Sequence, residues 1–319
     1  MRYDIFNGDA DGICALHQLR LDTPCPDAIL ITGVKRDIGL LSKLAADIHQ
    51  STLTVLDISL ETNRPYLQTL LADANQILYI DHHFAGEIPE SLALTAHINT
   101  DPDTCTSLLV DSLLQGRFRK WAIVGAFGDN LQNAADQAAQ SLSLSMPIRE
   151  QLRELGELLN YNGYGAELTD LHFHPADLYR TIRPYDDPLD FIASSSTLAI
   201  LRQGFQEDMA LALAQKVINP GNKNRIYHFP DLAWARRVSG VFANLKAREK
   251  REAAHALITH NADSTLRVSV RAPLIDRKNA DTLCLAFPSG GGRAAAAGIN
   301  HLPLEMLDEF ISVFQSTFH

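Results

Sequence analysis

The sequence contains few cysteines and no long apolar run. Its 319 residues include four cysteines, and no two of them form a Cys-x-x-Cys pair. Thiols spaced this far apart are typical of reduced, partly buried cysteines in a cytosolic protein. No apolar run approaches the roughly 18 residues that a membrane-spanning helix needs, and no charged leader precedes an apolar block after Met1. These absences predict a cytoplasmic protein without a signal peptide and without a membrane partner.

Positive charge is also scarce. The chain carries 28 Lys and Arg residues against 38 Asp and Glu residues, which gives a formal net charge of -10 at pH 7. This balance argues against a protein that coats duplex nucleic acid by electrostatic attraction. A small anionic substrate is still compatible with it, because a local cluster of cations or a metal ion can reverse the sign of the charge inside a cleft. The apolar content of 46% is sufficient for two domains with separate cores.

The stretch from Leu78 to Phe84 carries an acid and two imidazoles directly after an apolar, strand-like run. Asp81, His82 and His83 are good ligands and poor core residues, so at the end of a buried strand they predict a bound metal ion. Taken alone, they are equally consistent with a polar strand end that carries two surface histidines.

A second acidic pair follows the first predicted strand. Asp9 and Asp11 lie in a turn flanked by Gly8 and Gly12, ahead of a helical pattern. Glycine lets the backbone bend around a divalent ion that carboxylate oxygens hold. An ordinary Asx-rich turn that caps a helix is the alternative.

Strand-like runs alternate with helical patterns along the first half of the chain. This alternation predicts an α/β fold with a doubly wound parallel sheet. In such a sheet ligands bind beyond the carboxyl ends of the strands. Asp57 and Asp101 also follow strands, so we expect them at the same edge as the acids named above. The predicted strands cover residues 3–6, 28–32, 52–56, 77–80 and 94–98.

Two further features of the first half remain ambiguous when each is taken alone. Asp129 ends an apolar helical stretch over residues 121–127, where it is either a further metal ligand or a common helix stop. Lys35 and Arg36 follow the second predicted strand and could hold phosphate oxygens, although a solvated turn is the simpler interpretation.

The second half begins at the strongest linker signal of the chain, the sequence Asn-Pro-Gly-Asn at residues 219–222. We therefore predict a first domain over residues 1–218 and a second, smaller α/β domain over residues 223–319. Ahead of the linker, residues 189–217 are predicted as two helices broken near Gly204.

A glycine-rich segment, residues 288–293, lies in the second predicted domain. It has three consecutive glycines followed by Arg293, and a run of small residues follows over 294–298. Exposed backbone N–H groups, a small-residue helix start and a guanidinium together suit a phosphate or a carboxylate. A flexible hairpin is the alternative.

Together these motifs resemble the DHH phosphoesterase superfamily, which includes RecJ-like nucleases, NrnA-type oligoribonucleases, cyclic-dinucleotide phosphodiesterases and family II inorganic pyrophosphatases. The resemblance spans nearly the whole chain and is poorest over residues 160–219. The matching motifs of the first domain are Asn7–Gly12, Asp57–Ser59, Asp81–His83 and Gly128–Asn130. Those of the second, DHH-associated domain are Ser269-x-Arg271, Gly290–Gly292 and Ala296–Gly298.

The resemblance implies a paired manganese site in the first domain, with Mg2+ or Co2+ as alternative ions. Asp57 would bridge the two ions and Asp9 would serve the first. The second ion would be held by Asp11, His82 and Asp129.

The resemblance also implies the residues around the substrate. Asp81 would support the metal ligands, and His83 would face the phosphate. The residues expected to bind the substrate are Ser269, Arg271, Gly291, Gly292 and Arg293, with Lys35 and Arg36 from the first domain.

Two positions depart from the family pattern. The family usually has a metal-binding His four residues before the acid at Asp9, and this chain has Ile5 there. The first metal therefore loses a nitrogen ligand, which leaves one ion or two as open alternatives. The family usually has His after the glycines, where Arg293 is longer and permanently charged and favours anion binding.

The main hypothesis is a manganese-dependent enzyme of the phosphodiesterase or exonuclease kind. It would hydrolyse a nucleotide-type phosphodiester or phosphomonoester, with a nucleotide or short oligonucleotide as its partner. The substrate would lie in a cleft between the domains, and a hinge at residues 219–222 would gate access. The alternatives are a degenerate nucleotide sensor without activity and a pyrophosphate or polyphosphate hydrolase. A homodimer is compatible with each of them.

Overall fold

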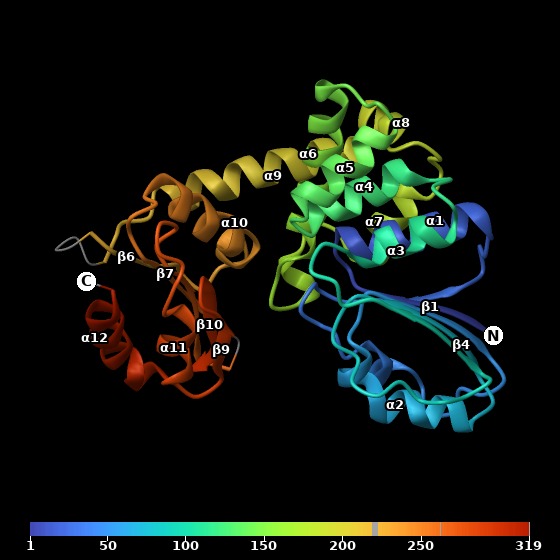
Figure 1. The fold of residues 1–319 in the computed structure, drawn as a ribbon, viewed down its shortest axis with the longest axis horizontal. Helices are drawn as coiled ribbons and strands as arrows, with labels where there is room; N and C mark the ends of the chain where they lie inside the picture. The colour runs from blue at the N-terminus through green and yellow to red at the C-terminus, as the bar shows by residue number, and fades with distance from the viewer. Residues whose placement is uncertain (219–222, 262, 319) are drawn as a thin grey trace. The chain divides into compact units, whose positions relative to one another are not determined.

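The computed structural model describes residues 1–218, 223–261 and 263–318. The chain divides into two compact units, Met1–Gln203 and Gly204–His319 (Figure 1). The predicted domain boundary at residue 218 falls in the second unit, and the predicted linker at 219–222 lies outside the described residues. None of the described helices is both long enough and apolar enough to span a membrane.

The first unit is built around a five-stranded parallel sheet. Phe6 pairs with Leu56 and Leu56 pairs with Ile80, so three neighbouring strands end level with one another. Groups that follow these strands therefore emerge at one edge of the sheet. In spatial order the strands are β2 (Ile29–Ile31), β1 (Arg2–Phe6), β3 (Thr52–Leu56), β4 (Gln76–Asp81) and β5 (Leu94–Ile98).

Helices cover both faces of this sheet. The helix α2 (Leu60–Ala72) lies on one face, and α1 (Ala10–Asp22) and α3 (Thr106–Leu113) lie on the other (Figure 1). The predicted doubly wound α/β fold is confirmed. The other helical elements of this unit are η1 (Leu40–Lys43), α4 (Arg119–Gly128), α5 (Gln132–Ser141), α6 (Met146–Gly163), η2 (Leu168–Asp170), α7 (Pro175–Ile182) and α8 (Pro188–Ser194).

The helix break predicted near Gly204 is wrong. The chain leaves helical geometry at Ser195, which is extended at φ -82° and ψ 119°, and the next helix, α9 (Ser196–Leu213), continues through Gly204. The Ser195 hydroxyl accepts a bond from the N–H of Leu198 at 3.4 Å and so caps the new helix. A helix tolerates an interior glycine at a cost of about 1 kcal/mol, whereas a capping serine satisfies a backbone N–H that has no partner within the helix.

The second unit is built around a mixed sheet of five strands. Only β6 and β7 run parallel; the other neighbours are antiparallel. In spatial order the strands are β6 (Arg225–His228), β7 (His255–His260), β8 (Leu266–Arg271), β10 (Ala296–Leu302) and β9 (Gly290–Arg293). The helical elements are α10 (Ala233–Glu249), α11 (Ala280–Leu285), η3 (Leu304–Met306) and α12 (Leu307–Thr317).

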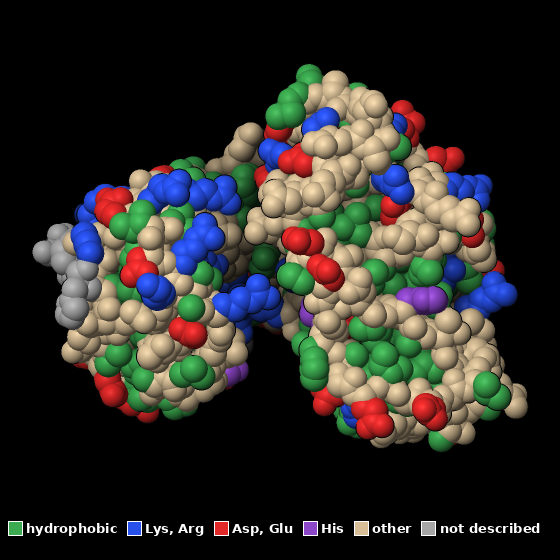
Figure 2. Space-filling model, viewed as in Figure 1, with side chains coloured by type: hydrophobic (Ala, Val, Ile, Leu, Met, Phe, Trp, Pro, Cys, Tyr) green, Lys and Arg blue, Asp and Glu red, His purple; other side chains and the backbone are tan. Residues whose placement is uncertain are grey.

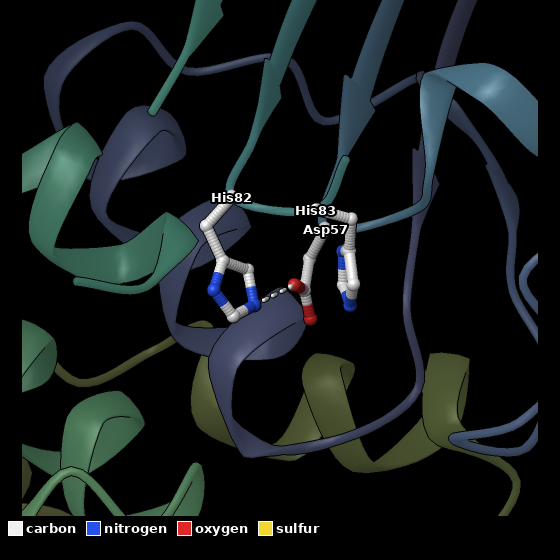
Figure 3. A group of neighbouring side chains, drawn as sticks. All are labelled: Asp57, His82 and His83. Carbon is white, nitrogen blue, oxygen red and sulfur yellow. Dashed lines mark ion pairs between the residues drawn. The ribbon is translucent and has the colours of Figure 1, made fainter. Parts of the chain in front are cut away.

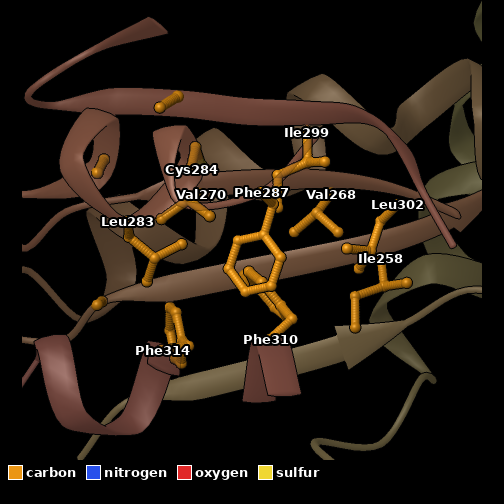
Figure 4. Close-up of a cluster of buried hydrophobic side chains, with 14 of the residues drawn as sticks. Ile258, Val268, Val270, Leu283, Cys284, Phe287, Ile299, Leu302, Phe310 and Phe314 are labelled. Carbon is orange, nitrogen blue, oxygen red and sulfur yellow. The ribbon is translucent and has the colours of Figure 1, made fainter. Parts of the chain in front are cut away.

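One face of this second sheet carries the apolar core of the unit. Val268 and Val270 of β8 and Ile299 of β10 are buried there, together with Phe310 and Phe314 of α12 (Figure 4). Burial alternates along both strands, which is the two-residue period of a strand with one face against the core.

The small-residue helix start predicted after Arg293 is also wrong. Residues 290–293 and 296–302 form a hairpin, in which Ala296 pairs with both Arg293 and Arg271. Buried Ala297 and Ile299 alternate with partly exposed neighbours, so the segment gains more from pairing along β8 than from a helix. The glycines still allow a close approach, because a Cβ on Gly292 would lie 2.5 Å from Cα of Ala297.

Candidate metal centre

The level strand ends bring acids from distant parts of the chain to one edge of the first sheet. Asp9 follows β1 and caps α1 by accepting the N–H of Gly12 at 3.0 Å. Asp57 follows β3, where φ is 59°, a conformation that Asp adopts at less cost than most side chains. Asp81 is the last residue of β4. All three carboxyl groups are buried.

The helix α3 holds the carboxylate of Asp11. The N–H groups of Thr106 and Ser107, its first two residues, donate to the two oxygens of Asp11 at 2.7 and 2.8 Å. The partial positive charge of a helix N-terminus stabilises an anion at this place. The Thr106 hydroxyl donates to Asp57 Oδ1 at 3.1 Å. The sequence did not indicate that Thr106 and Ser107 belong to the metal centre. The only feature that could have indicated it is that they begin a helix after a strand.

His82 lies at the middle of the group. Its Nε2 is 3.4 Å from Asp57 Oδ1 and 3.7 Å from Asp129 Oδ2. One ligand atom from each of Asp11, His82 and Asp129 lies within 4.8 Å of the others, and the same holds for Asp57, His82 and His83. Asp11, His82 and Asp129 therefore form one group, and Asp57 adjoins it through His82; these four residues come from four separate segments of the chain.

His83 is held by Asp81. Its Nδ1 lies 2.7 Å from Asp81 Oδ1, which fixes the ring beside Asp57 and His82 (Figure 3). Burial lowers the pKa of His83, but the hydrogen bond and charge of Asp81, together with the charges of Asp129 and Asp9, outweigh burial and leave this pKa above its ordinary value. Asp81 Oδ2 is buried and has no hydrogen-bond partner among the described residues. The pair thus presents an imidazole that is readily protonated beside the acidic group.

The acidic group lacks sufficient positive charge. Burial and the neighbouring charges of Asp11, Asp9 and Asp129 raise the pKa of Asp57 well above its ordinary value. Burial also raises the pKa of Asp129, and Lys35 offsets this only in part. Buried carboxylates need a compensating cation. Three carboxylates and one imidazole are a donor set that suits Mn2+ and similar divalent ions, so Asp11, Asp57, His82 and Asp129 fit such an ion.

Solved structures of DHH-domain proteins align over nearly the whole of this chain. RecJ from Thermus thermophilus, in complex with Mn2+, has a TM-score of 0.62 and 16% identity, over 99% of this chain and 51% of that chain. A DHH-domain member of the s1p family of ribosomal proteins has a TM-score of 0.60 and 13% identity, over 99% and 85%. The chain has the DHH fold. The pGpG-specific phosphodiesterase PggH from Vibrio cholerae shares it, with a TM-score of 0.55 and 13% identity over 99% of both chains. Neither family models nor curated proteins match the sequence.

In this DHH fold Lys35 lies among the acids. Its ammonium forms an ion pair with Asp9 and donates to Asp129 Oδ1 and Asn160 Oδ1, each at 3.0 Å. The sequence interpretation gave Lys35 a role in phosphate binding and did not identify Asn160. Arg36, the next residue, is exposed and forms no ion pair within the part of the chain that the structure describes.

Asp101 lies outside this centre. Its side chain is exposed, and its Oδ1 accepts the N–H of Asp103 at 2.9 Å. It belongs to neither group of ligand atoms among the described residues. The edge position of β5 explains this outcome, because β5 lies at the end of the sheet and away from β1.

In the second unit of the DHH fold, the strand register places two arginines on one face of the sheet. Ala296 pairs with Arg271 on one side and with Arg293 on the other, and directly paired residues share a face. Arg271 donates to Ser269 Oγ and to Asn244 Oδ1, each at 2.9 Å. Gly291 and Gly298 pair on the same face as Ser269, so the strip between the arginines carries no large side chain. We call this strip, with Arg271 and Arg293, the arginine patch.

Proposed function

We propose that this protein is a metal-dependent phosphoesterase that hydrolyses a nucleotide-type phosphodiester or phosphomonoester. The observation that carries the proposal is the grouping of Asp11, Asp57 and Asp129 around the His82 ring, with more negative charge than nearby cations balance. A divalent ion held there would act as a Lewis acid toward a water molecule and the phosphoryl oxygens. Mn2+ is the ion we favour, since RecJ of this fold is solved with Mn2+ and also with Mg2+.

The chain's own residues would bind and orient the phosphate. Asp81 holds His83 through Nδ1, which leaves Nε2 available to donate a proton to a phosphate oxygen. The raised pKa of His83 keeps more of the ring protonated at neutral pH than in a free histidine. Asp11 and Asp57 are kept in place by the N-terminal residues of α3, so they need little rearrangement when an ion binds.

We assign the arginine patch to a phosphate or other anionic group of the substrate. The second unit has 14 Lys and Arg residues against 11 Asp and Glu residues, whereas the whole chain has 28 against 38. Figure 2 shows several Lys and Arg side chains on the face of this unit that is in view. Arg293 is exposed, and guanidinium groups bind phosphate oxygens through two parallel hydrogen bonds.

A nucleotide is favoured over pyrophosphate by one side chain. Phe84 directly follows His83 and is 74% exposed, so its ring offers a stacking surface for a base beside the acidic centre. Pyrophosphate has no group that would use such a surface. The names of two proteins of this fold, the exonuclease RecJ and the pGpG-specific phosphodiesterase PggH, agree with a nucleotide substrate.

The test compares substrates and metals with the purified full chain. We expect release of mononucleotide from a linear dinucleotide in Mn2+, and a loss of at least about a hundredfold in rate when a chelator removes the ion. Phosphate release from pyrophosphate is the parallel assay. Faster cleavage of pyrophosphate than of the dinucleotide would favour the pyrophosphatase alternative. Calorimetric binding of a dinucleotide that is recovered intact would favour the sensor.

Arg293→Ala is expected to raise KM for the dinucleotide about tenfold, since a hydrogen bond to a charged group contributes about 1.5–3 kcal/mol. The turnover number should change less, because the substitution leaves the acidic centre intact. Arg277→Ala is the matched control, since Arg277 is also exposed, belongs to the same unit and lies outside the arginine patch. Equal KM values for the two variants would remove Arg293 from the substrate site.

A further inference from the structure

The ammonium of Lys35 has the surroundings of a bound cation. Its three protons meet three acceptors, which are Asp9 Oδ2, Asp129 Oδ1 and Asn160 Oδ1. The ring of Tyr164 lies beside it, with the ring centroid 5.8 Å from Nζ. The side chain is 21% exposed. Lys35 therefore has all its donors satisfied by the centre itself.

The backbone of Lys35 is fixed on both sides. Its N–H donates to the Gly163 carbonyl at 2.8 Å, and its carbonyl accepts from Asn7 Nδ2 at 3.1 Å. Gly33, two residues before Lys35, lies close to the turn after β1. A Cβ on Gly8 in that turn would lie 1.9 Å from the carbonyl oxygen of Gly33. Packing of the unit, rather than a mobile surface loop, thus delivers the lysine to the acids.

Lys35 divides the acidic centre into two parts of different charge. On one side, Lys35 forms ion pairs with Asp9 and with Asp129. Asp57 lies in the other part, where its ion pair among the described residues is with the His82 imidazole, at 3.4 Å. Only the part around Asp57 and His82 still requires a cation.

The DHH resemblance implied a metal ion beside Asp9, but the residues around Asp9 do not fit one. One oxygen of Asp9 accepts the N–H of Gly12, and the other pairs with the ammonium of Lys35, so a cation already stands where an ion beside Asp9 would lie. Ile5, which stands where the family has a histidine, is fully buried in an apolar cluster with Leu53 and Val55. It offers no ligand atom to an ion beside Asp9.

We propose that the ammonium of Lys35 takes the place of the first metal ion, so that the centre binds one divalent ion per chain instead of two. This inference rests on the proposed function for the remaining ion, at Asp11, Asp57, His82 and Asp129. Asp129 would join the two cations, because one oxygen faces Lys35 and the other lies near His82. An ammonium can neutralise charge and donate hydrogen bonds, but it cannot act as a Lewis acid toward water.

The test counts bound ions in the full chain. Protein equilibrated with Mn2+ and freed of excess metal is analysed by mass spectrometry, and its electron paramagnetic resonance spectrum distinguishes an isolated Mn2+ from a coupled pair. We expect one isolated ion in the wild type. In Lys35→Met, which frees Asp9 and one oxygen of Asp129, we expect a second ion at saturating Mn2+.

Lys43→Met is the matched control, because Lys43 pairs with Asp37 on the surface and not with the centre; its count should stay at one. Two ions in the wild type, or one ion in Lys35→Met despite an unchanged circular dichroism spectrum, would overturn the inference and leave the proposed function standing. No bound ion in the wild type would overturn both.

Discussion

Asp57→Asn is expected to lower the rate of phosphoester hydrolysis by about a thousandfold while the protein stays folded. Asn also adopts the positive φ found at this position, and its side-chain oxygen can still accept the bond from Thr106. What the substitution removes is the charge that faces His82. Losing a single charge-stabilising group at a reaction centre costs about a hundredfold to a thousandfold in rate, and loss of a metal ligand should reach the upper end of that range.

The same substitution is expected to stabilise the metal-free protein. The pKa of Asp57 is raised in the fold, so the fold disfavours the ionised carboxylate at every pH above the ordinary value near 3.8. A neutral amide avoids this cost, and Tm at pH 7 without metal should be equal to or above that of the wild type. Activity and metal-free Tm should therefore move in opposite directions.

Asp101→Asn is the control for Asp57→Asn. Asp101 is exposed and lies outside the centre, so activity and Tm should both stay near the wild-type values. Full activity in Asp57→Asn would contradict a role for Asp57 in the reaction. A lower Tm in the metal-free variant would contradict the charge repulsion that we infer from its pKa.

Gly8→Ala is expected to destabilise the first unit by about 3 kcal/mol or more. An added Cβ would lie 1.9 Å from the Gly33 carbonyl oxygen and 2.6 Å from Cγ of Pro175, and the backbone oxygen cannot move aside cheaply. The turn that must shift carries Asp9, and the segment against which it packs, which contains Gly33, also carries Lys35. The urea midpoint of unfolding and the affinity for Mn2+ should therefore fall together.

Gly39→Ala provides the comparison for Gly8→Ala. A Cβ at Gly39 would meet no atom within 4 Å, and φ at this position is -93°, which alanine adopts readily. We expect a change of less than about 0.5 kcal/mol in the free energy of unfolding. Equal urea midpoints for the two variants would show that the close approach of Gly8 to Gly33 does not limit stability.

The doubly wound α/β fold, and the acids and imidazoles that follow its strands, could be predicted from local pattern, whereas the DHH type and the set of metal ligands came from the family resemblance. Apolar runs of four to six residues alternate with helical periods, and this rhythm already implies a parallel sheet whose strand ends share an edge. Asp57 and Asp81 directly follow such runs, and His82 comes one residue later. Asp101 satisfied the same pattern, yet it is exposed, because the position of a strand within the sheet is not written in its own residues.

Helix and strand boundaries in small-residue segments were the least predictable. The run after Arg293 contains alanines that favour a helix, but pairing with β8 makes it a strand. Gly204 looked like a helix break, but the helix passes through it, and Ser195 makes the break instead. In both places a weak local preference was overridden by contacts with residues distant in sequence.

The groups that could form a metal centre can be identified without coordinates, since the chemistry of carboxylates and imidazoles after buried strands does not depend on remote contacts. How the charges of those groups are balanced depends on contacts that exist only in the folded chain. Lys35 reaches acceptors 26, 94 and 125 residues away, and Asp11 accepts N–H groups 95 and 96 residues away. Such partners are chosen by the packing of helices on the sheet, and no local pattern of residues encodes that packing.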